Sequence, residues 1–220
     1  MERNVKKKFI TGSIFIILFM IWTALIQIID VQPVGQNGTE IGFAAINCWF
    51  HNFTGVHMTL YTITDWMGLV PLFVCMTFAV VGVVQLIKRR SLFQVDADIL
   101  ILGAYYIIVI FCYIIFEMIP INYRPILING VLEASYPSST TLLVMGVMPT
   151  LVEQINRRLK TGGLKRIIQI FAIGFSAFMV IGRMICGVHW FTDIIGSVLL
   201  CTGLFTLYKS VVLLYLVSFK

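Results

Sequence analysis

Charged side chains are scarce in this sequence, making up 12% of its 220 residues, whereas hydrophobic residues make up 59% and the mean hydropathy is +0.96. So few charges exclude an ordinary water-soluble domain. The uncharged stretches between them are repeatedly long enough to cross a hydrocarbon layer of about 30 Å. The sequence therefore predicts an integral membrane protein.

The chain also lacks the features of a disulfide-stabilised or multidomain protein. Its five cysteines form no CxxC pair, and three of them lie inside apolar stretches, so we interpret them as small apolar residues. The sequence contains no internal repeat, no low-complexity tract and no linker long enough to separate two folded units. We expect residues 1–220 to form a single domain.

Acidic residues are outnumbered by basic ones, 10 against 16, which gives a net charge of +6. The basic surplus lies beside the apolar stretches, where membrane topology and attraction to anionic lipid account for it, so we expect no nucleic-acid partner. The basic residues form three clusters: Arg3, Lys6, Lys7 and Lys8; Lys88, Arg89 and Arg90; and Arg157, Arg158, Lys160, Lys165 and Arg166.

Six apolar stretches predict an all-α protein with six transmembrane helices, over residues 9–29, 66–87, 99–116, 140–152, 167–182 and 194–208, the last continuing past Lys209 to residue 219. The first stretch is longer than the apolar core of a cleaved signal, and no small-residue cleavage site follows it, so we interpret it as a retained anchor. The stretches 140–152 and 167–182 are short. Their flanking polar residues should therefore lie near the membrane surface or in a wet cavity.

Six spans place all three basic clusters, together with Lys220, on one side of the membrane. Because basic residues accumulate on the cytoplasmic side, we expect a multi-pass protein of the cell membrane with both termini in the cytoplasm. The segments 30–65, 117–137 and 187–191 then lie on the outer face.

The longest of these outer segments, residues 30–65, begins with turn-forming pairs. Apolar residues then recur at helical spacing, at Ile46, Trp49, Phe50, Phe53 and Leu60. This pattern predicts an interfacial helix between the first and second spans, with its aromatic side chains toward the lipid. Such a helix could border a lipid access route or serve only as a structural cover.

Two arginines stand at the ends of apolar stretches, where a charge is costly and is kept by default for function. Arg124 and Arg183 each supply a guanidinium fork that matches the oxygens of a phosphate. Ser138 follows Pro137 at the start of a span, where its hydroxyl and the next backbone N–H groups can face an anion. These three residues predict an anion-binding site at the outer face.

His189 and Asp193 are four residues apart, so on a helix they would share a face. A carboxylate behind an imidazole selects its tautomer and steadies its charged form, which is the arrangement of an activated nucleophile or base. A metal site is the weaker interpretation, because one histidine and one carboxylate leave a zinc site short of ligands unless His51 or His57 folds over it. We therefore expect no metal and no cofactor.

These motifs resemble the three signatures of the type-2 phosphatidic acid phosphatase superfamily, in Arg124-Pro125, in Pro137-Ser138 and in the run Arg183, His189, Asp193. The resemblance implies a metal-independent phosphatase in which His189 attacks phosphorus to form a phosphohistidine and Asp193 orients it. It further implies that Arg124, Arg183 and Ser138, with Ser139 beside it, hold the phosphate.

The sequence departs from this family pattern at four positions. Glu117 stands where a lysine is expected, Ser139 and Thr140 replace the glycine and the histidine of the second motif, and Gly182 replaces a serine. The family's histidine is taken to protonate the leaving oxygen, for which a threonine hydroxyl is far too weak an acid. Glu117 could supply the proton, or it could only form an ion pair with Arg124.

Because a phosphate monoester leaves as a stable anion, a lipid diphosphate depends less than a monophosphate on the missing acid. We therefore predict a membrane lipid phosphatase whose preferred substrate is a polyprenyl diphosphate. The competing hypothesis is a protein that keeps the phosphate pocket to bind, transport or sense a lipid phosphate without turnover.

Overall fold

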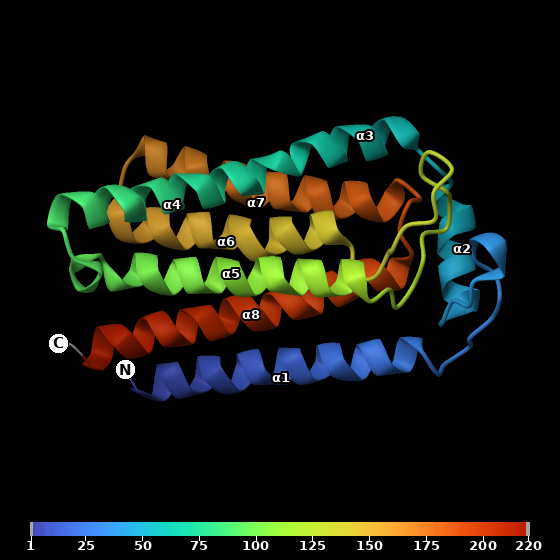
Figure 1. Cartoon of the computed structure of the whole chain (residues 1–220), viewed down its shortest axis with the longest axis horizontal. Helices are drawn as coiled ribbons and strands as arrows, with labels where there is room; N and C mark the ends of the chain where they lie inside the picture. The colour runs from blue at the N-terminus through green and yellow to red at the C-terminus, as the bar shows by residue number, and fades with distance from the viewer. Residues whose placement is uncertain (1, 219–220) are drawn as a thin grey trace.

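The structure is a computed structural model that describes residues 2–218, and in this range it contains helices, turns and isolated bridges but no β-sheet. The main helices are α1 (Glu2–Ile26), α2 (Ala44–Thr54), α3 (Met58–Met67), α4 (Leu69–Arg89), α5 (Ala97–Met118), α6 (Ser139–Arg158), α7 (Gly163–Ile185) and α8 (Phe191–Ser218), with short 3₁₀ turns at Gln36–Gly38 and Leu92–Gln94. The long helices run side by side, and α2 lies across one end of the bundle (Figure 1). The all-α fold is therefore confirmed.

Within residues 2–218, five helices are long and apolar enough to cross a membrane: Glu2–Ile26, Met58–Arg89, Ala97–Met118, Gly163–Ile185 and Phe191–Leu216. The remaining predicted span, the fourth at residues 140–152, corresponds to α6, which has 20 residues and is less apolar. A helix of that length reaches about 30 Å. The helix α6 is thus long enough to cross a membrane, but its composition does not mark it as a span.

Two polar residues of α6, Thr150 and Gln154, are buried and have partners inside the bundle. The Thr150 hydroxyl lies 2.7 Å from the Tyr106 hydroxyl of α5, and the Gln154 amide donates to the Tyr208 hydroxyl of α8 at 3.2 Å. Buried polar groups are tolerated when they are hydrogen-bonded in this way. The helix therefore occupies the interior of the bundle, packed against α4, α5, α7 and α8, in spite of its polar sequence.

The segment 30–65 forms two helices instead of one. Ile46, Trp49, Phe50 and Phe53 lie on α2, but Leu60 lies on α3, because α2 ends at Thr54 and the chain turns before Met58. The Trp49 and Phe53 rings stack at 5.8 Å and are mostly exposed, whereas the opposite face of α2 is held to α8. There Asn47 donates to the Thr192 hydroxyl at 3.0 Å.

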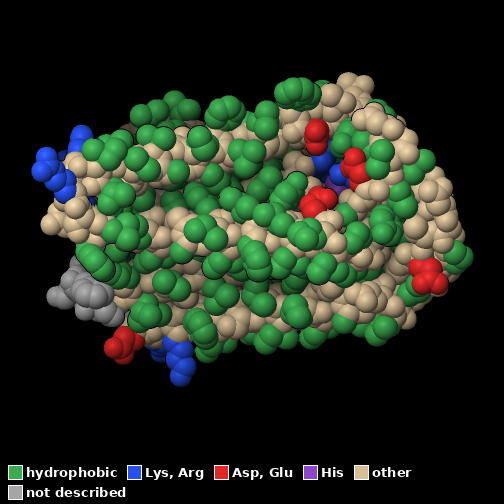
Figure 2. Space-filling model, in the orientation of Figure 1, with side chains coloured by type: hydrophobic (Ala, Val, Ile, Leu, Met, Phe, Trp, Pro, Cys, Tyr) green, Lys and Arg blue, Asp and Glu red, His purple; other side chains and the backbone are tan. Residues whose placement is uncertain are grey.

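The three basic clusters gather at the end of the bundle opposite α2 (Figures 1 and 2). Ion pairs join neighbouring helices there, with Arg89 and Asp96 at 2.8 Å and Arg158 and Asp98 at 2.9 Å. The helix α1 begins and α8 ends at this same end. Lys220 lies outside the described residues.

Candidate active site

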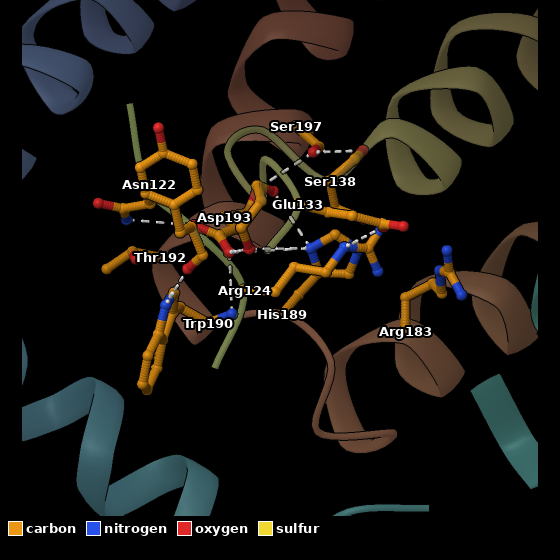
Figure 3. A network of polar contacts seen from close by, with 12 residues as sticks. Asn122, Arg124, Glu133, Ser138, Arg183, His189, Trp190, Thr192, Asp193 and Ser197 are labelled. Carbon is orange, nitrogen blue, oxygen red and sulfur yellow. Dashed lines mark hydrogen bonds and ion pairs between the residues drawn. The ribbon is translucent and has the colours of Figure 1, made fainter. Parts of the chain in front are cut away.

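The predicted site residues meet at the end of the bundle that carries α2. They come from the 119–138 connection between α5 and α6, from the last turns of α7, and from the turn that leads into α8 (Figure 3). All seven residues of the three motifs are buried, and Ser138, Arg183, His189 and Asp193 are among the most buried polar residues that the structure describes. The structure thus brings together the side chains that the sequence places far apart.

Arg183 is buried near the end of α7, with its side chain 1% exposed. Its Nη2 donates to the Thr140 hydroxyl at 2.6 Å and to the Asp65 carboxylate at 3.2 Å. Its guanidinium also lies over the Tyr61 ring, 4.9 Å from the centroid. Two residues of α3, Tyr61 and Asp65, therefore form one wall around this arginine.

Arg124 lies in the loop before α6 and is also buried. Its Nε is 3.1 Å from the Glu133 carboxylate, and its guanidinium carbon is 5.8 Å from the Tyr61 centroid. The backbone fixes this pair, because the Arg124 N–H donates to the Glu133 carbonyl at 3.0 Å. The carboxylate that forms an ion pair with Arg124 is thus Glu133, whereas the sequence suggested Glu117 as one candidate for that role.

The second motif begins the helix α6. Ser138 precedes the first helical residue, Ser139, and its carbonyl accepts the Leu142 N–H at 2.8 Å. The Ser138 hydroxyl makes no capping bond, and its carbonyl also accepts the Ser197 hydroxyl at 3.0 Å. The hydroxyl and the N-terminus of α6 therefore remain available to an anion, as the sequence predicts.

His189 and Asp193 do not share a helix face, because α8 begins at Phe191 and His189 lies in the turn before it. The cause is local: Asp193 accepts the Trp190 N–H at 2.9 Å and so caps the helix from its own first turn. The premise of one shared helix is wrong, although the two side chains still approach, with Nδ1 of His189 3.8 Å from the carboxylate.

Ser135 lies between these two residues. Nδ1 of His189 is 3.1 Å from the Ser135 carbonyl oxygen and 3.2 Å from its hydroxyl, and this hydroxyl donates to Asp193. Asn122 donates to the other carboxylate oxygen of Asp193 at 3.4 Å. Asp193 thus positions the imidazole through Ser135.

This arrangement assigns the proton of the imidazole to Nδ1, since acceptors surround that nitrogen, and leaves Nε2 with its lone pair. Burial, followed by the nearby charges of Arg124 and Arg183, holds the pKa of His189 well below its usual range. The imidazole is therefore neutral at neutral pH, which is the state a nucleophile requires.

Eight buried side-chain atoms among the described residues have no hydrogen-bond partner, and five of them belong to this site. They are Nε and Nη1 of Arg124, Oγ of Ser138, Nε of Arg183 and Nε2 of His189. The Arg124 Nε is close to Glu133 without the alignment of a hydrogen bond. Four of these atoms are donors, and such a concentration of unsatisfied donors is typical of a site built for a polyanion.

Glu117 lies at the end of α5, beside Ser135 and Ser139 in the lining of a cavity of about 10 Å³, room for about one water. The Thr140 oxygen accepts a hydrogen bond from Arg183, and its hydroxyl is too weak an acid to replace the histidine of the family.

Among residues 2–218, no three His, Cys, Asp or Glu side chains are grouped so that they could hold a metal ion. The His51 ring packs 5.6 Å from the Trp190 ring, and Nε2 of His57 lies 2.8 Å from the Thr54 carbonyl.

Sequence reasoning missed four residues of the site, namely Tyr61, Asp65, Asn122 and Ser135. Tyr61 and Asp65 are four apart on α3, a spacing that could have been noticed. Asn122 and Ser135 lie in an irregular loop, where no periodicity marks them.

Residues 119–215 match the PAP2 superfamily, which confirms the resemblance to type-2 phosphatidic acid phosphatases. The fold is similar to the crystal structure of a transmembrane PAP2-type phosphatidylglycerolphosphate phosphatase from Bacillus subtilis, with a TM-score of 0.61, 17% identity, and coverage of 95% of this chain and 97% of the other. No curated protein matches the sequence.

Proposed function

Because residues 119–215 carry a PAP2 superfamily match, we propose that the protein is a membrane lipid phosphatase that works through a phosphohistidine. The observation that carries this proposal is the convergence of unpartnered buried donors from Arg124, Ser138 and Arg183 on the free Nε2 of His189. Together they offer an anion several hydrogen bonds and a nucleophile. Ser139, at the first position of α6, adds its backbone N–H to this cradle.

In the first step, Nε2 of His189 forms a bond to phosphorus while the bond from phosphorus to the leaving oxygen breaks. Ser135 accepts from Nδ1 and keeps the imidazole in the required tautomer, and Asp193 holds Ser135. The two guanidiniums stabilise the charge that builds on the phosphoryl oxygens. This chemistry needs no metal.

The leaving group must depart without help from Thr140, whose hydroxyl is bound by Arg183. A lipid monophosphate that leaves from a diphosphate is a stable anion, so we propose a lipid diphosphate of the polyprenyl class as the preferred substrate. Glu117 is the alternative proton donor, supported by its place beside Ser139.

The orientation proposed from the sequence places the site at the outer leaflet. The basic clusters at the opposite end of the bundle support a cytoplasmic position for that end. With α6 counted as a sixth span, α1 begins and α8 ends on the cytoplasmic side. The exposed Trp49 and Phe53 of α2 support an interfacial position for this helix.

A lipid-phosphate binding protein without turnover is the second candidate, favoured by the engagement of Thr140 with Arg183. An oriented imidazole with a free Nε2 has no purpose in such a protein, and this favours the enzyme.

The test is phosphate release by the purified protein from a prenyl diphosphate and from its matched monophosphate. We expect the diphosphate to react at least about 10-fold faster, and His189→Ala to lose about 10³-fold or more of the activity. EDTA should leave the rate unchanged. Saturable lipid binding without turnover would instead identify the binding protein, and loss of activity in EDTA with recovery by a divalent ion would contradict the metal-free mechanism.

A further inference from the structure

Asp65 lies beside the position where the second motif departs from its family. The same nitrogen, Nη2 of Arg183, donates to the Thr140 hydroxyl at 2.6 Å and to the Asp65 carboxylate at 3.2 Å. Two oxygens that share one donor are near neighbours. A carboxylate from α3 therefore stands next to the residue that replaces the expected histidine.

The surroundings of Asp65 allow water to reach it. Its side chain is 55% exposed, whereas that of Arg183 is 1% exposed. Acidic side chains rim the hollow in which an arginine and a histidine are visible at the α2 end of the molecule (Figure 2). Asp65 thus contacts both solvent and the buried guanidinium of Arg183.

The rest of α3 holds this carboxylate in place. The Tyr61 carbonyl and the Thr64 hydroxyl accept from Nη1 of Arg183 at 3.5 and 3.4 Å, and the Tyr61 ring packs on the same guanidinium. Asp65 follows directly on this helix. Its carboxylate is therefore fixed relative to the arginine and hence to a phosphoryl group that the arginine binds.

The second half of the reaction needs a base. Water must attack the phosphohistidine from the side opposite Nε2, where the leaving group departed, and it must lose a proton as it does so. A threonine hydroxyl cannot take that proton. A carboxylate that is ion-paired with a guanidinium carries the negative charge that a base requires.

We propose that Asp65 is the general base of this water step, an inference that rests on the proposed phosphohistidine. An Asp65 oxygen accepts a proton from water while the water oxygen bonds to phosphorus. The bond between phosphorus and Nε2 breaks, its electron pair returns to His189, and inorganic phosphate leaves. The Thr140 hydroxyl, beside Asp65, helps to hold the water.

Besides Asp193, which contacts Ser135, two more carboxylates lie near the site, and they are placed differently from Asp65. Glu133 is paired with Nε of Arg124 at 3.1 Å, on the loop that precedes α6. Glu117 lines the small cavity with Tyr136 and Ser139. Asp65 accepts a hydrogen bond from the same Arg183 nitrogen as Thr140, and this position makes it our candidate for the base.

A rapid-quench experiment separates the two steps, using the purified full chain and a prenyl diphosphate labelled in the terminal phosphate. In Asp65→Asn, the lipid monophosphate should still be released in a first burst of one per active site at the wild-type rate. Steady-state turnover should then fall by about 10² or more, with label accumulating on His189. Asp65→Glu should restore part of the steady-state rate.

Glu133→Gln is the matched control, because it removes a carboxylate from the other site arginine. It should alter substrate affinity without trapping label. Vanadate binding verifies that each variant keeps a folded site. If Asp65→Asn slows the burst as much as the steady state, or weakens vanadate binding without trapping label, Asp65 only positions Arg183 and the inference is overturned.

Failure of the underlying function gives a different result. If wild type turns over neither the diphosphate nor the monophosphate, or if His189→Ala keeps activity and no variant traps label on histidine, the phosphohistidine mechanism itself is wrong.

Discussion

The two nitrogens of the His189 ring have separate surroundings. Nδ1 faces the carbonyl and hydroxyl of Ser135, while Nε2 is buried without a partner beside two guanidiniums. A positive imidazolium would be repelled by both arginines and would lose its hydration. The two arginines that we propose as phosphate ligands therefore also keep the proposed nucleophile uncharged.

The lowered pKa of His189 has a measurable effect on stability. Between the lowered pKa of the folded protein and the ordinary value of about 6.5, the unfolded chain binds a proton that the folded chain does not. The free energy of unfolding should therefore decrease as the pH falls through this window, by up to about 1.4 kcal/mol per pH unit. Above about pH 6.5 this contribution is constant.

The measurement compares denaturation of wild type and His189→Gln in detergent at pH 7.5 and 5.5. Wild type should lose more stability than the variant on acidification, and His57→Gln serves as a control with a native His189. Equal losses in wild type and His189→Gln would contradict the lowered pKa.

At the scale of elements, Gly196 of α8 lets the helix approach the loop that leads to Ser138. A Cβ added at Gly196 would lie 2.4 Å from the Tyr136 ring, which is itself 1% exposed. The Tyr136 hydroxyl lies 2.7 Å from the Thr23 hydroxyl of α1, so the ring cannot move away freely. Three segments of the chain thus meet at this one contact.

We expect Gly196→Ala to destabilise the protein by about 1–3 kcal/mol, because it overpacks a rigid ring. Displacement of Tyr136 should also shift Ser138 and lower activity. Gly174→Ala is the matched control, since a Cβ there meets nothing within 4 Å. Thermal unfolding of the purified variants measures the difference, and equal stability of the two would refute the role of this contact.

Sequence reasoning succeeded where chemistry or composition marks a residue. Arg124, Ser138, Arg183 and His189 stand out as polar groups beside apolar stretches, and the structure brings them together. Ser135 could not be found, because a lone serine in an irregular loop has no spacing that identifies it. Its role depends on a tertiary approach to His189 and Asp193.

Element boundaries were predicted less well than element type. The helix α8 begins at Phe191, and the hydrogen bond from the Trp190 N–H to the Asp193 carboxylate caps it there. His189 therefore lies in a turn before the helix, although its spacing from Asp193 predicts that both lie on one helix. Likewise α6 can be buried in spite of its polar residues because Tyr106 and Tyr208, on other helices, form hydrogen bonds with them. The local sequence pattern of a helix does not reveal hydrogen-bond partners on other helices.

At the scale of the whole molecule, charge divides the bundle into two unlike ends. The basic clusters occupy one end, and the site with its acidic rim occupies the other (Figure 2). The positive-inside tendency supports the proposal that the basic end faces the cytoplasm. On that proposal the site lies at the outer face.

Cysteine labelling in intact cells tests that orientation. In a Cys48→Ser background, Glu40→Cys, at an exposed position of the 30–43 loop, should react with an impermeant maleimide from outside. Gly162→Cys, where a side chain meets nothing within 4 Å, should react only after the membrane is opened. The reverse pattern would place the site in the cytoplasm.

The placement of His189, Arg124 and Arg183 at one end of the bundle would also make the proposed reaction directional. Phosphate cut from the lipid would be delivered only into the compartment that this end faces. The shortened lipid stays in the leaflet where it was bound. A cell that reuses both products must therefore recover them by separate routes, one for a soluble ion and one for a lipid that has to change leaflet.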